Sequence, residues 1–383
     1  MTTPAGDMLV FGAGNIGRGL FGQLAAEAGR GVAFVEALAP TAERLRRAGA
    51  YTVRLVGRGE TATRVSGFRV LEPSEADAVG GAVRSCAFAA TAVGGEHLPE
   101  IAAVLAPGLR GRERPLNVLV GENFPHADRV LADALLAAGA GEGTFACAPC
   151  SVERMVRPEP GSLDLIGEGG QSLFFDASRC AGAPPELPGL VPCRDLAPYY
   201  ARKLFTNNAG HAVLAYEGHL AGCERLTDAL DRPEIRARLE ALLAAAAAML
   251  VRECGWDRAA MASHVDDLLR HRFANRALAD TVRRVARQPL RKLGPEERLV
   301  GLLRRLGRHG LAIAPVCRTI AAAMAYRDPD DAEAVRMAAL LARGGAARVL
   351  REVCGLHPEE EAHRACMAEW MELRASAREG DGG

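Results

Sequence analysis

The sequence lacks an excess of charge of either sign, because 47 lysine and arginine residues balance 47 aspartate and glutamate residues. A protein that binds nucleic acid or an anionic membrane through a basic surface usually carries a net positive charge. The charge balance therefore points to neither nucleic acid nor a membrane as a partner. Hydrophobic residues make up 49% and charged residues 25% of the chain, which is typical of a soluble globular protein.

Long uncharged hydrophobic runs are also missing. No apolar segment reaches the ~18 residues without charge that a transmembrane helix requires. The alanine-rich tract from Leu239 to Val251 is shorter than that and has a helical pattern. The first residues, Met1 to Asp7, contain no basic stretch followed by an apolar one, so no signal peptide is predicted. We therefore expect the chain to be cytoplasmic.

Two familiar metal-binding patterns are missing as well. The histidines form neither H-x-x-x-H nor H-E-x-x-H, and no metal is predicted. Cys147 and Cys150 have the spacing of a redox motif, but no second pair completes a zinc site. We interpret the ten cysteines as buried thiols rather than disulfides, and Cys147 to Cys150 as the end of a strand.

The sequence does contain a glycine-rich turn between a strand and a helix. The apolar strand from Met8 leads into the residues Phe11, Gly12, Ala13, Gly14, Asn15, Ile16, Gly17, Arg18 and Gly19, and a helical pattern continues to Ala28. In this G-x-G-x-x-G pattern Gly12 permits a tight turn, Gly14 leaves room for a pyrophosphate, and Gly17 allows close packing of helix and strand. The N-terminus of the helix would hold the phosphates.

An acidic residue follows the second predicted strand. Val32 to Val35 is apolar and ends at Glu36, which is placed to accept hydrogen bonds from the adenosine ribose and to repel a 2′-phosphate. The pattern predicts NAD rather than NADP as the cofactor. Glu36 and the residues of the glycine turn are the candidate NAD-binding residues. For the Arg18 side chain we expect contact with the diphosphate or exposure to solvent.

Strands and helices alternate through the first half of the chain. The apolar, non-alternating strands predict an α/β fold with a doubly wound Rossmann-type sheet, which binds ligands at the carboxyl ends of its strands. Two further predicted strands end near Thr91, Val93 and Glu122, which join the cofactor-binding candidates. A region rich in proline and glycine, from Pro158 to Pro192, predicts a domain boundary. We expect an NAD-binding domain over residues 1–198 and a mostly α-helical substrate domain over residues 199–383.

A lysine, an asparagine and a histidine form a second informative group. On a helix, positions 203, 207 and 211 share a face, so Lys203, Asn208 and His211 can line one broad side. Desolvation lowers the pKa of a lysine, so that it can take a hydroxyl proton. An asparagine amide can stabilise a developing alkoxide, and a histidine can orient the substrate. Spacing alone leaves an alternative to a catalytic group. In it, the three residues form a polar helix face, with Lys203 in solvent and His211 capping a neighbouring turn.

These three residues resemble the K-x-x-x-x-N-x-x-H signature of the polyol-specific long-chain dehydrogenases and reductases. The resemblance extends over nearly the whole chain. It includes F-G-A-G-N-I-G-R-G at 11–19, T-A-V-G at 91–94, Glu122-Asn123, R-K-L-F-T at 202–206 and R-Q-P-L-R-K-L at 287–293. The last segment and the compact length are similar to the members that act on phosphorylated polyols.

The resemblance implies an NAD-dependent, zinc-independent hydride transfer between a linear polyol phosphate and a ketose phosphate. D-mannitol 1-phosphate and D-fructose 6-phosphate are the expected pair. Lys203 would be the general acid and base, Asn208 and Asn123 would form the oxyanion pocket, and His211 would position the substrate. Members of the family work as monomers or homodimers.

Substrate contacts are predicted at two further places. Three cations within residues 287–292 could form a fork for a sugar phosphate, although a solvated basic helix end is the alternative from the residues alone. With the resemblance, Arg287 and Arg291 are the predicted phosphate contacts. Glu153, in V-E-R-M-V-R-P where the family usually has V-D-R-I-V-P, is the third predicted substrate contact. A dehydrogenase of another polyol, polyol phosphate or hexuronate, and an NAD-sensing protein without catalysis, remain alternatives.

Overall fold

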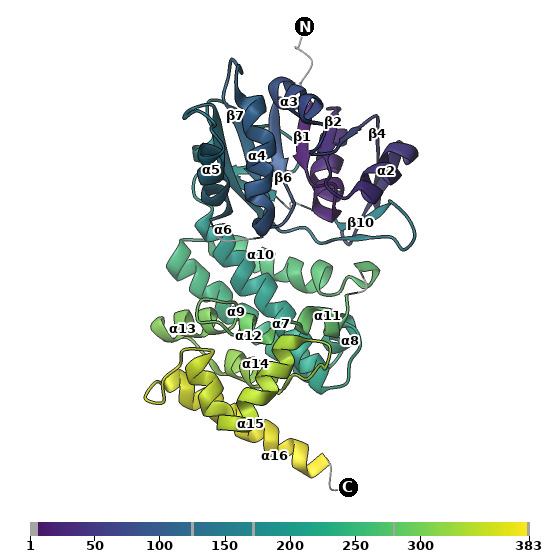
Figure 1. The fold of residues 1–383 in the computed structure, drawn as a ribbon. Coiled ribbons are helices and arrows are strands. Elements are labelled where there is room, and N and C mark those ends of the chain that lie inside the picture. The colour runs from purple at the N-terminus through teal and green to yellow at the C-terminus, as the bar shows by residue number, and fades with distance from the viewer. Residues whose placement is uncertain (1–6, 124–125, 171–172, 279, 381–383) are drawn as a thin grey trace. The chain divides into compact units, whose positions relative to one another are not determined.

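The chain divides into two compact units, Met1–Tyr199 and Tyr200–Gly383, one residue beyond the expected boundary. The computed structural model describes residues 7–123, 126–170, 173–278 and 280–380, and side chains as far as Ser376 (Figure 1). No helix in this described part has both the length and the apolar character that crossing a bilayer requires.

Unit 1 is built on an eight-stranded sheet. Its strand order is β12-β11-β8-β7-β6-β1-β2-β5, and only β8 and β11 pair antiparallel. Taken in chain order, the six strands from β5 to β8 have the 3-2-1-4-5-6 arrangement of the Rossmann fold, which confirms the predicted fold class. The strands are β1 (Met8–Phe11), β2 (Val32–Val35), β5 (Arg69–Leu71), β6 (Phe88–Thr91), β7 (Leu116–Val120), β8 (Phe145–Val152), β11 (Leu173–Asp176) and β12 (Leu190–Cys193).

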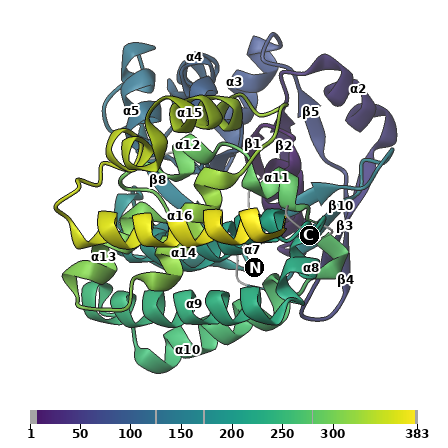
Figure 2. The same cartoon turned by 90° about the horizontal axis from the view of Figure 1, so that it is seen from below.

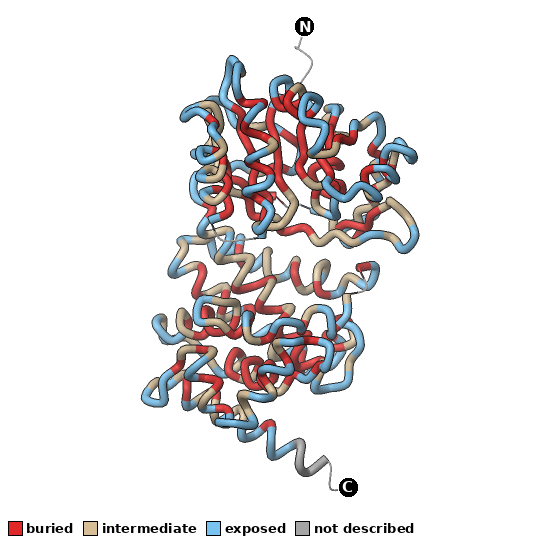
Figure 3. Tube along the Cα trace, in the orientation of Figure 1, coloured by how far each residue is buried: buried red, intermediate tan, exposed pale blue. Residues whose placement is uncertain are grey.

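Helices and a second sheet cover the two faces of this large sheet. Because neighbouring side chains of a strand point to opposite faces, Met8 and Val10 pack on one side while Leu9 and Phe11 pack on the other. The face that carries Leu9 is covered by α3 (Ala76–Ser85), α4 (Leu98–Leu109) and α5 (Ala127–Ala137). The face that carries Met8 is covered by the helix over residues 17–27 and by three strands of the second sheet, β3 (Ala50–Val56), β4 (Thr61–Ser66) and β10 (Leu165–Glu168). The strands of the large sheet are correspondingly buried (Figure 3).

The helices of unit 1 include the one that begins in the glycine turn, which is π-helical over Gly17–Gly22. They are η1 (Gly17–Gly22), α1 (Gln23–Glu27), α2 (Ala39–Ala48), α3 (Ala76–Ser85), η2 (Gly95–His97), α4 (Leu98–Leu109), α5 (Ala127–Ala137) and η3 (Ala177–Arg179). The second sheet has the order β4-β3-β10-β9 and consists of β3 (Ala50–Val56), β4 (Thr61–Ser66), β9 (Val156–Pro158) and β10 (Leu165–Glu168).

The expectation of a domain boundary over Pro158 to Pro192 is wrong. This region contributes β10 to the small sheet and β11 and β12 to the edge of the large sheet. β11 and β12 are short. Pro192 lies in β12, at the edge of the large sheet, and the other prolines of this region lie outside both strands. Sheets tolerate proline in edge strands and outside strands, but not in central ones. The chain leaves unit 1 only at α6 (Ala197–Arg202).

Unit 2 is helical, as predicted, and is organised around α7 (Ala209–Leu220). Nearly every residue of α7 is buried, and α7 contacts α8, α9, α11 and α14. α16 packs against α14, and the two helices run side by side in Figure 2. The remaining helices are η4 (Lys203–Asn208), α8 (Leu226–Leu230), α9 (Pro233–Cys254), α10 (Arg258–Asp267), η5 (Leu268–Arg272), η6 (Arg276–Leu278), α11 (Val282–Ala286), α12 (Pro289–Lys292), α13 (Val300–Arg308), α14 (Ala314–Ala325), α15 (Ala332–Glu352) and α16 (Glu361–Gly380).

Candidate active site

Backbone hydrogen bonds join the turns at the carboxyl edge of the large sheet. The N–H of Gly12 donates to the carbonyl of Val35 at 2.8 Å, and the N–H of Ala92 donates to that of Phe11 at 2.9 Å. The N–H of Gly121 donates to the carbonyl of Thr91 at 3.1 Å. The turns after β1, β2, β6 and β7 therefore lie side by side where open α/β sheets bind their ligands.

The three glycines of the turn have the surroundings that a dinucleotide requires. Gly12 has a φ of +90°, and a Cβ there would lie 2.5 Å from the carbonyl oxygen of Ala92. A Cβ on Gly17 would lie 1.8 Å from the oxygen of Gly12, so the helix can approach the strand only without a side chain. A Cβ on Gly14 would meet nothing within 4 Å. The turn thus has open space at the glycine that a pyrophosphate would approach.

Glu36 is buried and already bound to the glycine turn. Its Oε2 accepts from the N–H of Ala13, and its Oε1 accepts from the N–H of Leu38, both at 2.8 Å. A carboxylate offers about four acceptor positions, so Glu36 can also accept ribose hydroxyls. Leu38, which the sequence reasoning missed, is 67% exposed beside this carboxylate. Its apolar side chain is a further candidate contact for the adenosine.

The Arg18 side chain is buried, which excludes exposure to solvent, one of the two expected alternatives, and leaves contact with the diphosphate as a prediction. Its Nε donates to the carbonyl of Ala13 at 2.7 Å and its Nη1 to that of Leu163 at 2.5 Å. The guanidinium also lies over the Tyr51 ring, 5.4 Å from the centroid. Burial lowers the pKa of Arg18. These contacts fasten the start of the first helix to the small sheet.

Glu122 supports the turn after β6. Its two carboxylate oxygens accept from the N–H of Val93 at 3.0 Å and of Gly94 at 2.8 Å. The hydroxyl oxygen of Thr91, at the end of β6, is buried without a hydrogen-bond partner among the described residues. Asn123 follows Glu122 and is exposed. Glu122 therefore shapes the loop near which a nicotinamide is expected.

Glu153 directly follows β8, and its side chain is buried. The next residue, Arg154, donates from Nη1 to the carbonyl of Gly19 at 3.3 Å and to Oε1 of Gln23 at 2.6 Å. Burial lowers the pKa of Arg154 to about 10. The segment carrying Glu153 is in this way tied to the helix that begins in the glycine turn.

Cys147 and Cys150 lie within β8 and on opposite sides of the sheet, because they pack in the two different cores. Burial raises the pKa of both thiols, that of Cys147 to about 12. Within the described part of the chain neither forms a disulfide. The interpretation as strand thiols is confirmed, although they stand in the body of β8 rather than only at its end.

Lys203 and Asn208 begin and end a π-helical turn, not the α-helix that the sequence predicts. A π-helix bonds residue i to i+5, so Asn208 follows Lys203 by one turn on the same side. In the predicted α-helix Asn207 would have taken that place. Both Lys203 and Asn208 are half-buried. Single π-helical turns within helices occur frequently at functional sites.

His211 lies one α-helical turn after Asn208 and is half-buried. Its Nδ1 is 2.8 Å from the carbonyl oxygen of Asn207, so Nδ1 carries the proton and Nε2 is the acceptor. The Phe273 ring packs edge-on against the imidazole, with centroids 4.9 Å apart. Burial, followed by the charge of Arg272, lowers the pKa of His211 to about 4. His211 is therefore a neutral hydrogen-bond acceptor near pH 7.

Arg272 and Phe273 were not found from the sequence, because they lie some 60 residues after the motif and have no spacing relation to it.

The scarcity of lysine is a further sequence signal that points to Lys203. Lys203 and Lys292 are the only lysines in the chain. Arginine is not deprotonated in proteins. Apart from the histidines, Lys203 and Lys292 are thus the only side chains whose cationic form can release a proton.

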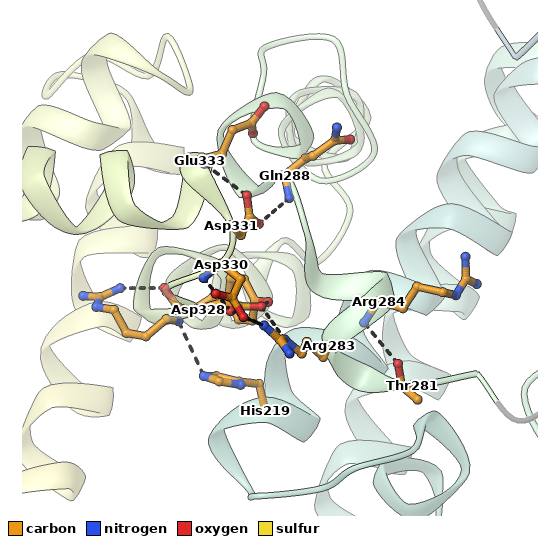
Figure 4. A network of polar contacts seen from close by, with 11 residues as sticks. His219, Thr281, Arg283, Arg284, Gln288, Asp328, Asp330, Asp331 and Glu333 are labelled. Carbon is orange, nitrogen blue, oxygen red and sulfur yellow. Dashed lines mark hydrogen bonds and ion pairs between the residues drawn. The ribbon is translucent and has the colours of Figure 1, made fainter. Parts of the chain in front are cut away.

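The segment R-Q-P-L-R-K-L begins directly after α11 and contains the whole of α12. Asp331 fixes it by accepting from the N–H of Gln288 at 2.8 Å, within a polar network that also includes Arg283 and Asp328 (Figure 4). Arg287 and Arg291 are exposed. Arg291 donates to Oε1 of Gln288 at 3.1 Å and to Oε1 of Glu297 at 3.2 Å.

Lys292, the third cation of this segment, is buried and donates to the carbonyl of Val285. Burial, with the charges of Arg298 and Arg291, lowers its pKa to about 7. Lys292 therefore caps the end of α11 and is not part of an exposed fork of three cations. α12 packs against α15, whereas η4 packs against α7 and α9.

Both units match known protein families. Residues 7–148 match the family model described as the mannitol dehydrogenase Rossmann domain, and residues 195–350 match the mannitol dehydrogenase C-terminal domain. The mannitol-1-phosphate 5-dehydrogenase of Pseudarthrobacter chlorophenolicus is 37% identical, over 91% of this chain and 93% of that protein. The enzyme of the same name from Brevibacillus brevis is 34% identical, over 92% and 95%.

Solved structures give the same fold. A substrate-free D-sorbitol dehydrogenase matches with a TM-score of 0.76 at 17% identity, over 97% of this chain and 93% of that chain. The ternary complex of Pseudomonas fluorescens mannitol 2-dehydrogenase with NAD and D-mannitol matches with a TM-score of 0.72 at 15% identity, over 98% and 94%. The chain belongs to the mannitol dehydrogenase family of oxidoreductases, the polyol-specific dehydrogenases and reductases that its motifs predict.

Proposed function

We propose that this enzyme is an NAD-dependent polyol phosphate dehydrogenase that interconverts D-mannitol 1-phosphate and D-fructose 6-phosphate. The observation that carries the proposal is the π-helical turn that places Lys203 and Asn208 one turn apart, directly before a neutral His211. The relatives that are 34–37% identical and named mannitol-1-phosphate 5-dehydrogenase support this substrate pair.

The residues of unit 1 suit NAD. The space beside Gly14 and the start of the first helix accept the diphosphate, because the first N–H groups of a helix have no partners within it. Glu36 accepts the ribose hydroxyls and repels a 2′-phosphate. Bound NAD supplies the nicotinamide carbon that accepts the hydride.

The residues of unit 2 handle the proton and the substrate oxygen. Lys203 takes the proton from the hydroxyl that is oxidised, and returns it in the reverse reaction. The amide N–H groups of Asn208 donate to the oxygen as it becomes an alkoxide. Asn123, which belongs to unit 1, is retained as a second proposed donor. Nε2 of His211 accepts from a neighbouring hydroxyl and so orients the sugar alcohol, since the bond from Nδ1 to Asn207 fixes the tautomer.

The phosphate of the substrate requires a cation. Arg287 and Arg291 remain the predicted contacts, but Arg291 is already bonded to Glu297. We add Arg272 as a candidate, because its charge acts directly on His211. Each of these three arginines is replaced by alanine in turn. The variant that loses the phosphate contact should have a raised KM for mannitol 1-phosphate and an unchanged kcat for unphosphorylated mannitol. The other two alanine variants supply the control. Glu153 is retained as a proposed substrate contact.

The decisive experiment is a spectrophotometric screen of NAD reduction with mannitol 1-phosphate, other polyol phosphates, free polyols and hexuronates. We expect mannitol 1-phosphate to give the highest kcat/KM, and NADP to be a poor substitute for NAD. A preference for a different polyol would reassign the substrate within the family. Binding of NAD without turnover of any compound would instead indicate a sensor.

Lys203→Ala and Lys203→Arg should both abolish turnover. Removal of a general base lowers kcat by about 10²–10⁴-fold, and arginine keeps the charge but cannot accept the proton. NAD binding, followed by fluorescence titration, should remain near that of the wild type. An active Lys203→Arg variant would show that the amine supplies only charge, and the mechanism would then need another base.

A further inference from the structure

Thr206 lies in the middle of the π-helical turn and is fully buried. Its Oγ1 donates to the carbonyl of Arg202 at 2.6 Å. Arg202 is four residues earlier, so its carbonyl is the one that the N–H of Thr206 would use in an α-helix. Bonds from threonine hydroxyls to the carbonyl at i−4 bend helices. The hydroxyl therefore competes with α-helical bonding at the start of the turn.

His264 of α10 holds the same hydroxyl from a different helix. Its Nε2 lies 2.9 Å from Oγ1 of Thr206. A threonine hydroxyl has a single hydrogen, which points to Arg202, so Thr206 accepts from the Nε2–H of His264. α10 packs against α9, and α9 also contacts η4. The hydroxyl is thus fixed between its own helix and a neighbouring element.

We propose that Thr206, held by His264, is a positioning residue that keeps residues 203–208 π-helical and so keeps Lys203 and Asn208 on one side. In an α-helix five residues turn through about 500°, which would point the two side chains about 140° apart. The inference rests on the proposed function, in which both side chains act on one substrate oxygen. It explains how a turn that most helices lack is stabilised at this point in the chain.

The direct test is a crystal structure of Thr206→Val, which keeps the side-chain shape and removes the hydroxyl. We expect residues 203–208 to change to i→i+4 hydrogen bonds, with Lys203 and Asn208 turned apart. Retention of the i→i+5 bonds in this variant would overturn the proposal. This outcome does not depend on which substrate the enzyme uses, so it separates the inference from the proposed function.

Kinetics supply the second test. Thr206→Val should lower kcat about ten- to a hundredfold, the cost of a small misplacement of catalytic groups, and leave the KM for NAD unchanged. Thr206→Ser, which keeps the hydroxyl, should restore kcat. If Thr206→Val is poorly folded, His264→Phe removes the donor from a half-buried position and should show the same loss of kcat.

Thr319→Val is the matched control. Thr319 is also fully buried. Its Oγ1 lies 2.9 Å from Oε1 of Glu217 in α7 and 3.1 Å from the carbonyl of Pro315, four residues earlier in α14, so it too has one partner in its own helix and one in another element. This variant should lose similar thermal stability but keep its kcat. An equal loss of kcat in Thr319→Val, or no rescue by Thr206→Ser, would show that the effect is general destabilisation. Absence of turnover in the wild type would reject the proposed function and leave the crystal structure to decide on Thr206.

Discussion

Lysine occurs at only two positions in this chain, and neither lysine is fully exposed to solvent. Lys203 is half-buried at the start of the π-helical turn, and Lys292 is buried beneath α11. Arginine could replace lysine wherever only a surface charge is needed, but its larger, rigid guanidinium does not fit a compact buried cap and does not release a proton. Use of lysine at just these two positions is consistent with a chemical role for Lys203 and a packing role for Lys292.

His211 gives a prediction that depends on pH. Its pKa is about 4 in the folded protein and about 6.5 in an unfolded chain. Between these values the unfolded chain binds the extra proton, so acidification from pH 7 to pH 5 should destabilise the wild type. His211→Gln should lose about 1–2 kcal/mol less over this range, as measured by urea unfolding.

The exposed His357 provides the control for that measurement. His357→Gln makes the same substitution away from the candidate site and shows how much of any change comes from the substitution itself. If His211→Gln shows the same loss of stability as the wild type, His211 is not held neutral by its surroundings. The bond to Asn207 and the packing against Phe273 would then have to be revised.

At the scale of elements, both units contain a π-helical turn within their candidate site residues. The carbonyl of Gly19 in η1 accepts from Arg154, and the carbonyl of Arg202, directly before η4, accepts from Thr206. The sequence predicts both helices but not their π-helical form. Hydrophobic periodicity over a few residues does not distinguish i→i+4 from i→i+5 bonding, and the groups that decide it come from distant parts of the chain.

The glycine turn offers a matched pair of substitutions. Gly17→Ala should destabilise the protein by ~3 kcal/mol or more, because the added Cβ would lie 1.8 Å from a backbone oxygen. Gly14→Ala should fold normally, because its Cβ meets nothing within 4 Å. It should still weaken NAD binding by about tenfold, equivalent to ~1.4 kcal/mol, if the diphosphate occupies that space.

Thermal unfolding and an NAD titration of the two variants decide this prediction. Normal NAD affinity in Gly14→Ala would place the diphosphate elsewhere. A stable Gly17→Ala protein would mean that the first helix can move away from β1, and the close packing of helix and strand would not be required.

At the scale of the whole molecule, the sequence predicts the two-part organisation but not the details of either part. The doubly wound Rossmann-type sheet was predictable because buried parallel strands are continuous apolar runs. The strands after Pro158 were not, because short strands in a segment rich in proline and glycine look like loops. The small sheet was not, because it pairs β3 with β10, which lies much later in the chain. In unit 2 the helices were predictable from periodicity. The network around Asp328 was not, because it joins α11 to the turn between α14 and α15.

That network gives a test of whether the two units are independent. Asp328 is buried and accepts from Nε and Nη2 of Arg283 at 2.8 and 2.9 Å. The hydrogen bonds from Arg283 keep the pKa of Asp328 well below its usual range. The carboxylate therefore stabilises the fold above the ordinary aspartate pKa, and this contribution is lost as the pH falls below about 4.

Asp328→Asn should lower the stability of unit 2 by about 2 kcal/mol at pH 7, because charged hydrogen bonds to a buried carboxylate are lost. The difference from the wild type in thermal unfolding should shrink below about pH 4. Asp330→Asn removes an exposed partner of the same Arg283 and should change stability little. NAD affinity at 25 °C should be unchanged in both variants, because the residues proposed to bind NAD all belong to unit 1. A loss of NAD affinity in Asp328→Asn would mean that the helical unit helps to hold the cofactor.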